Sequence, residues 1–457
     1  MLISPWLGHL NTEYMTVLYG SMKKRGRSYL KWLTPGLGIK RWLVVLLMGI
    51  TFISLGLAEI VIDLYRHQQL PDILATLMLR SLPNGVRILL AVGVGISLVA
   101  VGLYKLSRSI LEPFTGRHAL SVVDVVYAHN VRRRGLKVVA IGGGTGLPSI
   151  LRGMKRHTSN LTAIVTVADD GGSSGRLRRD LGILPPGDLR NNIAALANDE
   201  DLMTQLFQYR FGTGDLGGHS FGNLFLTALS SITGSMDRAL VEAERVLAIQ
   251  GSVLPATLDE ITLMGEVWHA DSAGLRSISG ESKITEAGGV IERVFISPPD
   301  ARAYPKSVQA ILAADLITIG PGSLFTSILP TLLIKGITEA IRASGALCVY
   351  VCNVATQPGE TDGFDVADHI LALERHIGGG LIDVVLANNH FPSLNAGENT
   401  HYVRPAPQEY EVTRYYQIVY ADLTDVQHPW RHDPTKLAQA LQEVYANYQA
   451  SLLKETA

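Results

Sequence analysis

The chain has 457 residues, a formal net charge of −1 and a hydrophobic content of 47%. This length is too great for one typical domain and sufficient to bury a sizeable core. The charge is divided unevenly: residues 1–134 hold 16 Lys and Arg against 6 Asp and Glu, whereas the remainder holds 24 against 35. The acidic remainder argues against nucleic acid as its main partner, and the basic beginning suits an anionic lipid surface.

Two apolar runs near the N-terminus predict a transmembrane helical hairpin. Trp42–Ile62 contains one acid, Glu59, and Ile88–Tyr104 contains no charged residue. A bilayer core of about 30 Å requires roughly 17–25 helical residues, so both runs are long enough to span it. A signal peptide is the alternative for the first run, but the basic segment before it is longer than a signal's n-region. A buried helical hairpin is the other alternative, and basic flanks are uncommon there.

The basic residues also predict the orientation of this hairpin. Lys and Arg precede the first run and follow the second, and the loop between the runs has fewer of them. By the positive-inside rule, both ends of the chain face the cytoplasm of a multi-pass inner-membrane protein. The expected organisation is a basic segment (1–41), the hairpin (42–104), a linker (105–136) and a ligand-binding domain (137–450).

From residue 137 onward, short apolar runs alternate with helical patterns. Near-continuous β-branched runs are typical of buried parallel strands. The alternation predicts an α/β fold: a Rossmann-like, doubly wound, mainly parallel sheet. Residues 252–300 have many turn signals and predict an antiparallel insertion. The expected strands are 137–141, 161–168, 315–320, 346–352 and 381–387, and the expected helices are 188–209, 222–248, 304–314 and 364–377.

A glycine-rich turn follows the first expected strand. Gly142, Gly143, Gly144, Thr145 and Gly146 precede Pro148, a residue suited to the first turn of a helix. Backbone N–H groups at such a helix start favour a phosphate. The pattern lacks the third glycine of the dinucleotide fingerprint and the Gly-Lys-Ser/Thr of a P-loop. A tight turn without a ligand is the alternative interpretation of this motif alone.

An acidic loop, "ADDGGSSGRLRRDLG", follows the second expected strand. Asp169 and Asp170 could bind ribose hydroxyls or a metal, or accept a proton from a substrate hydroxyl. Ser173 and Ser174 add hydroxyl and N–H groups. The alternative is helix capping and turn formation, for which two adjacent acids are more than is needed.

Further polar loops follow other expected strands or begin helices. In open α/β sheets such loops meet at the carboxyl edge, so their convergence predicts a cleft for a phosphate-bearing ligand. Asp188 is the expected N-cap of the helix that follows "PPG". His219 is interpreted as a solvated loop residue rather than a base, and Cys348 and Cys352 as unbridged core residues. The predicted ligand contacts in these loops are Arg190, Asn191, Asn223, Gly320, Gly322, Ser323, Thr326, Ser327, Asn353, Thr356 and Gln357.

Five ordered segments resemble the gluconeogenesis factor family, which groups with the CofD-like 2-phospho-lactate transferases. They are "GGGTGLPSILRGMK", "VTVADDGGSSGRLRRDLGILPPGDLRNNIAAL", "GHSFGNLFLTAL", "IGPGSLFTSILPTLLIKGI" and "CNVATQPGETDGF". The resemblance covers roughly residues 137–445. It implies a Rossmann-like fold and nucleotide-sugar binding that links carbon metabolism to cell-wall synthesis and cell shape. The membrane hairpin departs from the family's usual form.

The resemblance leaves two functions open. The first is a regulator that binds a nucleotide sugar, requires no cofactor and signals to cell-wall synthesis proteins. The second is a transferase that moves a phosphate-linked lactyl-type group from a guanine nucleotide to a deazaflavin, with Asp169 and Asp170 as catalytic residues that hold Mg²⁺. The segment "WRHDPTK" resembles the family's closing motif, which implies that Arg431 reaches a ligand phosphate; an ordinary surface arginine is the alternative. A homo-oligomer is compatible with either function.

Overall fold

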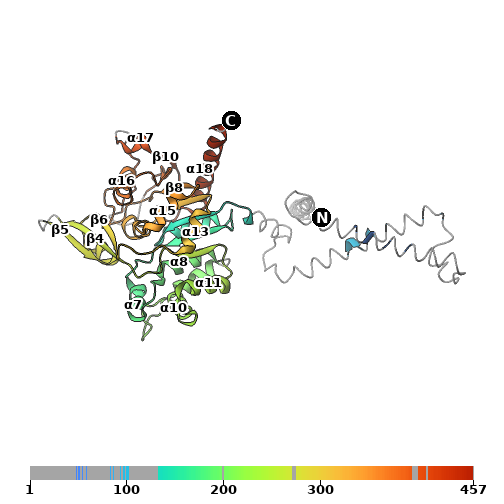
Figure 1. Cartoon of the computed structure of the whole chain (residues 1–457), viewed down its shortest axis with the longest axis horizontal. Helices are drawn as coiled ribbons and strands as arrows, with labels where there is room; N and C mark the ends of the chain where they lie inside the picture. The colour runs from blue at the N-terminus through green and yellow to red at the C-terminus, as the bar shows by residue number, and fades with distance from the viewer. Residues whose placement is uncertain are drawn as a thin grey trace, which may run out of the picture. The chain divides into compact units, whose positions relative to one another are not determined.

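The computed structural model describes residues 132–197, 200–269, 274–393, 400–407 and 410–455, together with scattered positions between 48 and 101. The chain divides into two compact units, Met1–Val131 and Arg132–Ala457. Most of the predicted basic segment, hairpin and linker lies outside the described residues. The second unit contains the labelled strands and helices of Figure 1.

In the first unit, the described positions of both predicted spans are helical, among them Met48, Ile50, Ile96 and Val101. Among the residues that the structure describes, no single helix combines the length and apolar composition needed to cross a membrane. Two consecutive helical segments of the second unit, Leu324–Leu332 and Lys335–Ala343, pass that test only together and are bent by 72°.

A seven-stranded sheet forms the centre of the second unit, in the order β10-β9-β8-β7-β1-β2-β3. Every pairing in it is parallel. The first three strands lie on one side and the later four on the other, so the strand order reverses between β1 and β7. The strands are β1 (Val138–Gly142), β2 (Leu161–Val165), β3 (Ser252–Pro255), β7 (Leu316–Ile319), β8 (Leu347–Val351), β9 (Val384–Asn388) and β10 (Gln417–Ala421).

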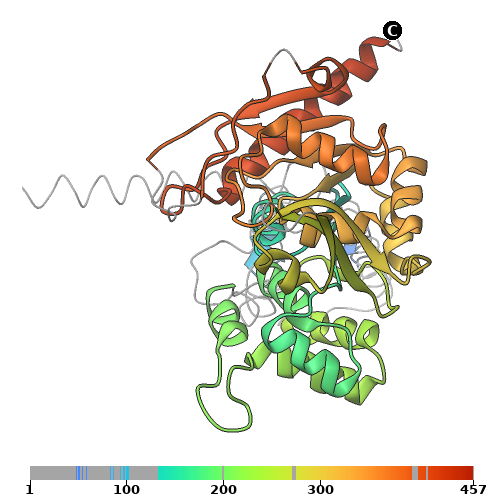
Figure 2. The same cartoon turned by 90° about the vertical axis from the view of Figure 1, so that its left-hand side faces the viewer.

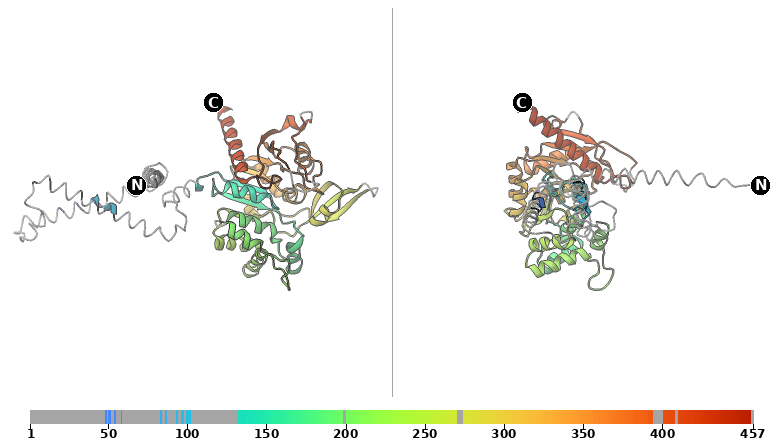
Figure 3. Two further views of the ribbon diagram at one scale, coloured as in Figure 1. Left: turned by 180° about the vertical axis from the view of Figure 1, so that it is seen from behind. Right: turned by 90° about the vertical axis from the view of Figure 1, so that its right-hand side faces the viewer.

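The antiparallel insertion is confirmed with one correction. β4 (Thr262–His269) pairs with β5 (Gly274–Ser279) and with β6 (Val290–Ser297) in a separate antiparallel sheet. This sheet projects from one side of the unit (Figures 1 and 3), the side that faces the viewer in Figure 2. Residues 252–255 were expected in the insertion, but β3 pairs with β2 and extends the parallel sheet.

Helices cover both faces of the parallel sheet because alternate strand residues point to opposite sides. Val138 and Ala140 belong to the core shared with α6, α8, α10, α11 and α18, whereas Val139 and Ile141 belong to the core shared with α13, α15 and α16. These helices are α6 (Leu147–Met154), α7 (Gly172–Leu181), α8 (Pro186–Leu196), α9 (Glu200–Gln208), α10 (Phe221–Thr233), α11 (Met236–Leu247), α12 (Glu281–Glu286), α13 (Pro305–Leu312), α14 (Leu329–Leu332), α15 (Lys335–Ala343), α16 (Val366–Ile377), α17 (Val412–Tyr415) and α18 (Pro434–Glu455), with the π-helical segment η2 (Leu324–Ile328) before α14.

Two long predicted helices are each divided in two. The expected helix 188–209 becomes α8 and α9 because Ala197 takes an extended conformation, with φ −61° and ψ 148°. The expected helix 222–248 becomes α10 and α11 because Gly234 adopts the left-handed conformation, with φ 84°. A glycine at this position ends a helix without the steric penalty that a side chain would bring.

The compact unit begins at Arg132, a few residues before the predicted domain start at residue 137. The Arg132 carbonyl accepts hydrogen bonds from the backbone N–H groups of Gly135 and Ser159 at 3.1 and 3.0 Å. Asn160 Nδ2 donates to the carbonyls of Arg133 and Gly135 at 3.0 and 2.8 Å. The segment 132–136 therefore closes the loop before β2.

We expect a fragment of residues 132–457 to fold without the first unit, because it contains every strand of both sheets. A fragment of residues 137–457 lacks the bonds to Arg132, Arg133 and Gly135, each worth about 1 kcal/mol. It should therefore unfold at a lower urea concentration, as measured by circular dichroism. Equal midpoints for the two fragments would show that the segment 132–136 is not part of the folded unit.

Candidate functional site

Two glycine-containing loops meet where the strand order reverses. Gly320 N donates to Ile141 O at 2.8 Å, which joins the end of β7 to the end of β1. A β-carbon on Gly146 would lie 2.5 Å from the carbonyl oxygen of Pro321. Gly144 has φ +62°, a backbone conformation that residues other than glycine rarely adopt, and it lies beside the buried Ser327. The glycines here allow one backbone to approach another.

Asp188 links the glycine turn to α8. Its Oδ2 accepts a hydrogen bond from Gly144 N at 2.7 Å. Asp188 was expected as the N-cap of α8, but Pro185 holds that place, and the Asp188 side chain bonds to the turn after β1 instead. Burial, together with the negative charge of Asp169, raises the pKa of Asp188 to about 6, although its bond to Gly144 opposes the shift. The N–H of Gly144 is thus occupied by a carboxylate rather than open to a phosphate.

The two acids after β2 have different surroundings. Asp169 accepts a hydrogen bond from Gly171 N at 2.8 Å, and burial raises its pKa. Asp170 accepts one from Ser282 N, in the first turn of α12, at 3.1 Å. Asp170 therefore attaches the antiparallel insertion to the end of β2, and Asp169 faces the inner part of the cleft.

Ser173 and Ser174 lie in the first turn of α7 and are buried. Asn223 Nδ2 lies 3.1 Å from Ser173 Oγ and 3.5 Å from Ser174 Oγ. Ser173 Oγ also lies 3.0 Å from Nδ1 of His219. Burial and the nearby Arg176 charge lower the pKa of His219. The predicted contacts Ser173, Ser174 and Asn223 thus form one network, and His219 belongs to it.

Three arginines surround a small cavity beside this network. Arg152, Arg190 and Arg431 line about 110 Å³ together with Thr145 and Asn191. Arg190 is 8% exposed and donates to Ser220 Oγ at 2.6 Å and to Asn191 Oδ1 at 2.8 Å. Arg431 comes from the loop after β10, whereas the others come from α6 and α8. Arginines from three separate segments and a helix start make this cavity suitable for an anion.

Other predicted contacts brace the loops from within. Asn353 Nδ2 donates to Gly322 O at 2.9 Å, and Gly322 N donates to Asn353 Oδ1 at 3.2 Å. Gln357 Nε2 donates to Ser323 Oγ at 2.6 Å. Thr356 exchanges two hydrogen bonds with the backbone of His401. These side chains hold the 320–323 loop and the 400–403 segment in place.

Two further glutamates, Glu281 and Glu360, lie within electrostatic range of each other, and Glu281 also interacts with Asp169 and Asp188. Thr326 Oγ1 donates to Glu360 Oε1 at 3.0 Å, and burial raises the pKa of Glu360. Burial also raises the pKa of Glu281 well above its usual range, with further contributions from Asp169 and Asp188. Among the described residues, six side chains of the segments around this sheet edge carry a buried polar atom without a hydrogen-bond partner: Arg190, Asn192, Thr204, Asn223, Glu281 and Glu360. Such atoms gather where a ligand supplies the missing partners.

The predicted metal ligands Asp169 and Asp170 point to different neighbours. In the described part of the chain, no three His, Cys, Asp or Glu side chains are grouped so that they could hold a metal ion. Cys348 and Cys352 are buried and unbridged, as expected.

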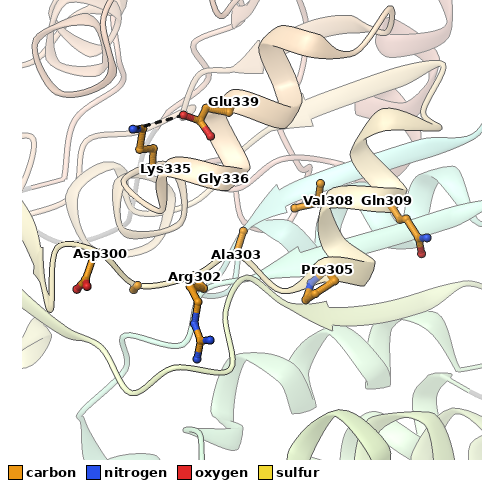
Figure 4. Close-up of a pocket in the computed structure, with 10 residues that line it drawn as sticks. Asp300, Arg302, Ala303, Pro305, Val308, Gln309, Lys335, Gly336 and Glu339 are labelled. Atoms are coloured by element: carbon orange, nitrogen blue, oxygen red, sulfur yellow. Dashed lines mark ion pairs between the residues drawn. The ribbon is translucent and has the colours of Figure 1, made fainter.

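A larger cavity of about 640 Å³ lies elsewhere on the unit (Figure 4). It is lined by α13, α15 and the segment before α13, and Lys335 and Glu339 form an ion pair of 3.6 Å at its rim. Arg302 at this rim is highly exposed. None of the predicted contacts and none of the glycine loops lines this cavity, so we assign the functional site to the sheet edge.

The fold defines an α/β protein with a mainly parallel sheet, a small antiparallel sheet and an arginine-lined cavity near the reversal of strand order. A family model described as "2-phospho-L-lactate transferase CofD" matches residues 138–444. The chain therefore belongs to the CofD family, and to its branch of proteins named gluconeogenesis factor.

Several relatives support this assignment. A Bacillus subtilis protein named "Gluconeogenesis factor" is 51% identical over 254 residues, or 55% of this chain and 78% of its own length. A relative from Nostoc is 45% identical over 434 residues, covering 92% of this chain and 93% of its own. A crystal structure of a Bacillus halodurans UPF0052 family member matches with a TM-score of 0.62 and 44% identity, covering 67% of this chain and 99% of that chain.

The motif-based prediction missed several residues of the cleft. Arg152 and Thr204 lie in helix interiors, and Glu281 lies in the insertion, so none of them belongs to a glycine-rich loop. His219 was noted in the sequence but not as part of the site. The available signal was weak: Arg152 is the only basic residue within α6, five positions after its start at Leu147.

We expect Asp188→Asn to stabilise the protein relative to the wild type, and to do so more at high pH than at low pH. Asn keeps an acceptor for Gly144 N and removes a carboxylate whose folded-state pKa is raised from 3.8 to about 6. The wild-type carboxylate destabilises the fold increasingly above pH 3.8, and this penalty is complete above pH 6. The gain in unfolding free energy should grow from near zero at pH 4 to on the order of 1–3 kcal/mol at pH 7.5.

Chemical denaturation at both pH values measures this difference directly. Comparison of the two proteins cancels the contributions of titrating groups that do not interact with Asp188, such as His369 and His432, whose pKa values burial lowers to about 4. The exposed Asp215→Asn is the matched control for a change of surface charge. A gain that is the same at pH 4 and pH 7.5 would contradict the prediction.

Proposed function

We propose that the protein is a regulator that binds a nucleotide sugar in the cleft at the carboxyl edge of the parallel sheet. The observation that carries this proposal is the cavity lined by Arg152, Arg190 and Arg431 beside the start of α6. Guanidinium groups from separate segments match the several oxygens of a diphosphate better than a single charge does. The relatives' name, gluconeogenesis factor, supports a role in carbon metabolism. Our proposal extends this role to cell-wall synthesis and cell shape through protein partners.

The cleft also supports the non-phosphate part of such a ligand. The charge of Asp188 interacts both with Arg190 of the arginine cavity and with the carboxyls of Asp169 and Glu281. Hydroxyl groups of a ribose or sugar donate well to carboxylate oxygens. A ligand with an anionic diphosphate and hydroxyl-rich rings therefore complements both charges of the cleft.

A transferase of the CofD type is the second candidate, and the family match over residues 138–444 favours it. It would move a phosphate-linked lactyl-type group from a guanine nucleotide to a deazaflavin, with Mg²⁺ held near Asp169 and Asp170. Asp170 already accepts a hydrogen bond from the insertion, whereas Asp169 accepts one from Gly171 in its own loop. Asp169 is therefore the more suitable of the two to hold Mg²⁺. The regulatory function remains our first proposal because the arginine cavity accounts for binding without requiring turnover.

We further propose that the first unit anchors this domain in the inner membrane as a hairpin. The described positions Met48, Ile96 and Val101 are helical and are 55%, 65% and 55% exposed. Exposed apolar side chains on helices are stabilised by a lipid environment. Homo-oligomers are compatible with this arrangement.

We expect Arg431→Ala to weaken nucleotide-sugar binding about ten- to hundredfold, because it removes a charge-assisted contact to phosphate. The side chain is exposed at the rim of the cavity, so the fold should not change. Isothermal titration against UDP-, ADP- and GDP-sugars measures the affinity. The exposed Arg414→Ala is the matched control.

The same titration should include a turnover assay with guanine-nucleotide donors and a deazaflavin acceptor. Binding without product supports the regulator, and product formation that is lost in Asp169→Asn supports the transferase. If Arg431→Ala and Arg414→Ala bind equally well, the arginine cavity is not the phosphate site.

We expect both ends of the chain to be protected from protease added outside intact spheroplasts, because basic residues flank both predicted spans. Immunoblotting with antibodies to an N-terminal tag and to residues 132–457 measures protection. Lysis of the spheroplasts is the control that renders both ends accessible. Cleavage within residues 132–457 in intact spheroplasts would refute the orientation.

A further inference from the structure

Helix α12 crosses the carboxyl edge of the parallel sheet. Its first turn is attached to the loop after β2, where Ser282 N donates to Asp170 Oδ1. Its far end contacts the loop after β8, where a β-carbon on Gly359 would lie 2.6 Å from Thr285 O. β1 and β7 lie between β2 and β8 in the sheet. The antiparallel insertion therefore places α12 over the point where the strand order reverses.

Helix α12 brings Glu281 within electrostatic range of Glu360, a residue of the loop after β8. Glu281 begins α12, and its carboxyl interacts electrostatically with those of Glu360, Asp169 and Asp188. Glu360 is 8% exposed, and its Oε1 accepts a hydrogen bond from Thr326 Oγ1. Oε2 of Glu281 and Oε2 of Glu360 are buried and have no hydrogen-bond partner among the described residues. A buried acceptor without a donor costs free energy that a bound ligand can recover.

The chemistry of this pair favours hydroxyl groups over a cation. In the described part of the chain, no three acidic, His or Cys side chains are grouped to hold a metal. Separated acceptors from two elements instead match a ring with several hydroxyl groups, each of which donates one hydrogen bond. Asp188 connects this end of the cleft to Arg190, so phosphates at the arginines would place the next group towards α12.

We propose that Glu281 and Glu360 bind the hydroxyl groups of the ligand's sugar and determine its specificity, an inference that rests on the nucleotide-sugar binding proposed above. The arginine cavity binds the diphosphate, which every nucleotide of this class shares. The two glutamates distinguish a nucleotide sugar from the nucleoside diphosphate that lacks the sugar. A site with buried polar groups discriminates strongly against a ligand that leaves them unpaired.

The test compares paired ligands on the full-length chain: UDP-glucose with UDP, ADP-glucose with ADP, and GDP-mannose with GDP. For the pair that the wild type binds, the ratio of the two affinities measures sugar recognition. Glu281→Ala should lower this ratio about ten- to hundredfold and leave the diphosphate affinity unchanged. Glu281→Gln keeps an acceptor oxygen and should retain most of the ratio. Glu286→Ala, an exposed residue at the end of the same helix, is the matched control.

Each outcome decides the proposal. An unchanged ratio in folded Glu281→Ala overturns it, and so does an equal loss for both ligands, which would indicate a structural role. A loss that appears only with Mg²⁺ and disappears with EDTA assigns the glutamates to a cation and also overturns it. Failure of the wild type to bind any member of the panel refutes the proposed function itself. Should Glu281→Ala not fold, Glu360→Gln keeps the bond to Thr326, and its ratio must fall in the same direction.

Discussion

The cleft depends on the direct contact between two backbone loops at the reversal of strand order. Gly320 N bonds to Ile141 O, and Gly146 lies against the Pro321 carbonyl without room for a β-carbon. This contact fixes the start of α6, with Thr145 and Arg152, relative to the loop that Asn353 braces. A side chain at Gly146 would separate the loops and displace both walls of the site. The high glycine content of the turn is thus first a packing requirement and only then a ligand requirement.

The same packing places the positive charge of Arg190 near the negative charge of Asp188. Arg190 is held by Ser220 and Asn191, and Asp188 is held by Gly144, so neither can turn away. Burial disfavours the charged form of Asp188, Asp169 and Glu281 alike. A fold selected only for stability would avoid such a group of carboxyls. These carboxyls and the nearby polar atoms without hydrogen-bond partners distinguish the carboxyl edge of the sheet from the larger cavity near Lys335.

Sequence patterns predicted the parallel sheet because its central strands are β-branched and buried on both faces. They missed β3, a strand of four residues that ends in Pro255, and β10, whose alternation is weak. The expectation that ligands bind beyond the carboxyl ends of parallel strands located the polar loops. It did not predict the hydrogen-bond partners of individual side chains. Asn353 and Gln357 bond to the protein itself, and Asp188 bonds to the glycine turn after β1 instead of capping its helix. Glu281 enters the site through tertiary packing of the insertion, which no local pattern encodes.

The two units have separable physical roles. Every strand of both sheets lies after Arg132, so the binding cleft needs no residue of the first unit to form its core. The Bacillus halodurans structure matches 99% of its own length within 67% of this chain, whereas the Nostoc relative extends over 92% of it. The N-terminal segment is therefore outside the part that the Bacillus halodurans structure shares with this chain, and the Nostoc relative aligns with most of it. Within the second unit, the chain enters β1 at its amino end, whereas the proposed ligand contacts follow the carboxyl ends of the strands.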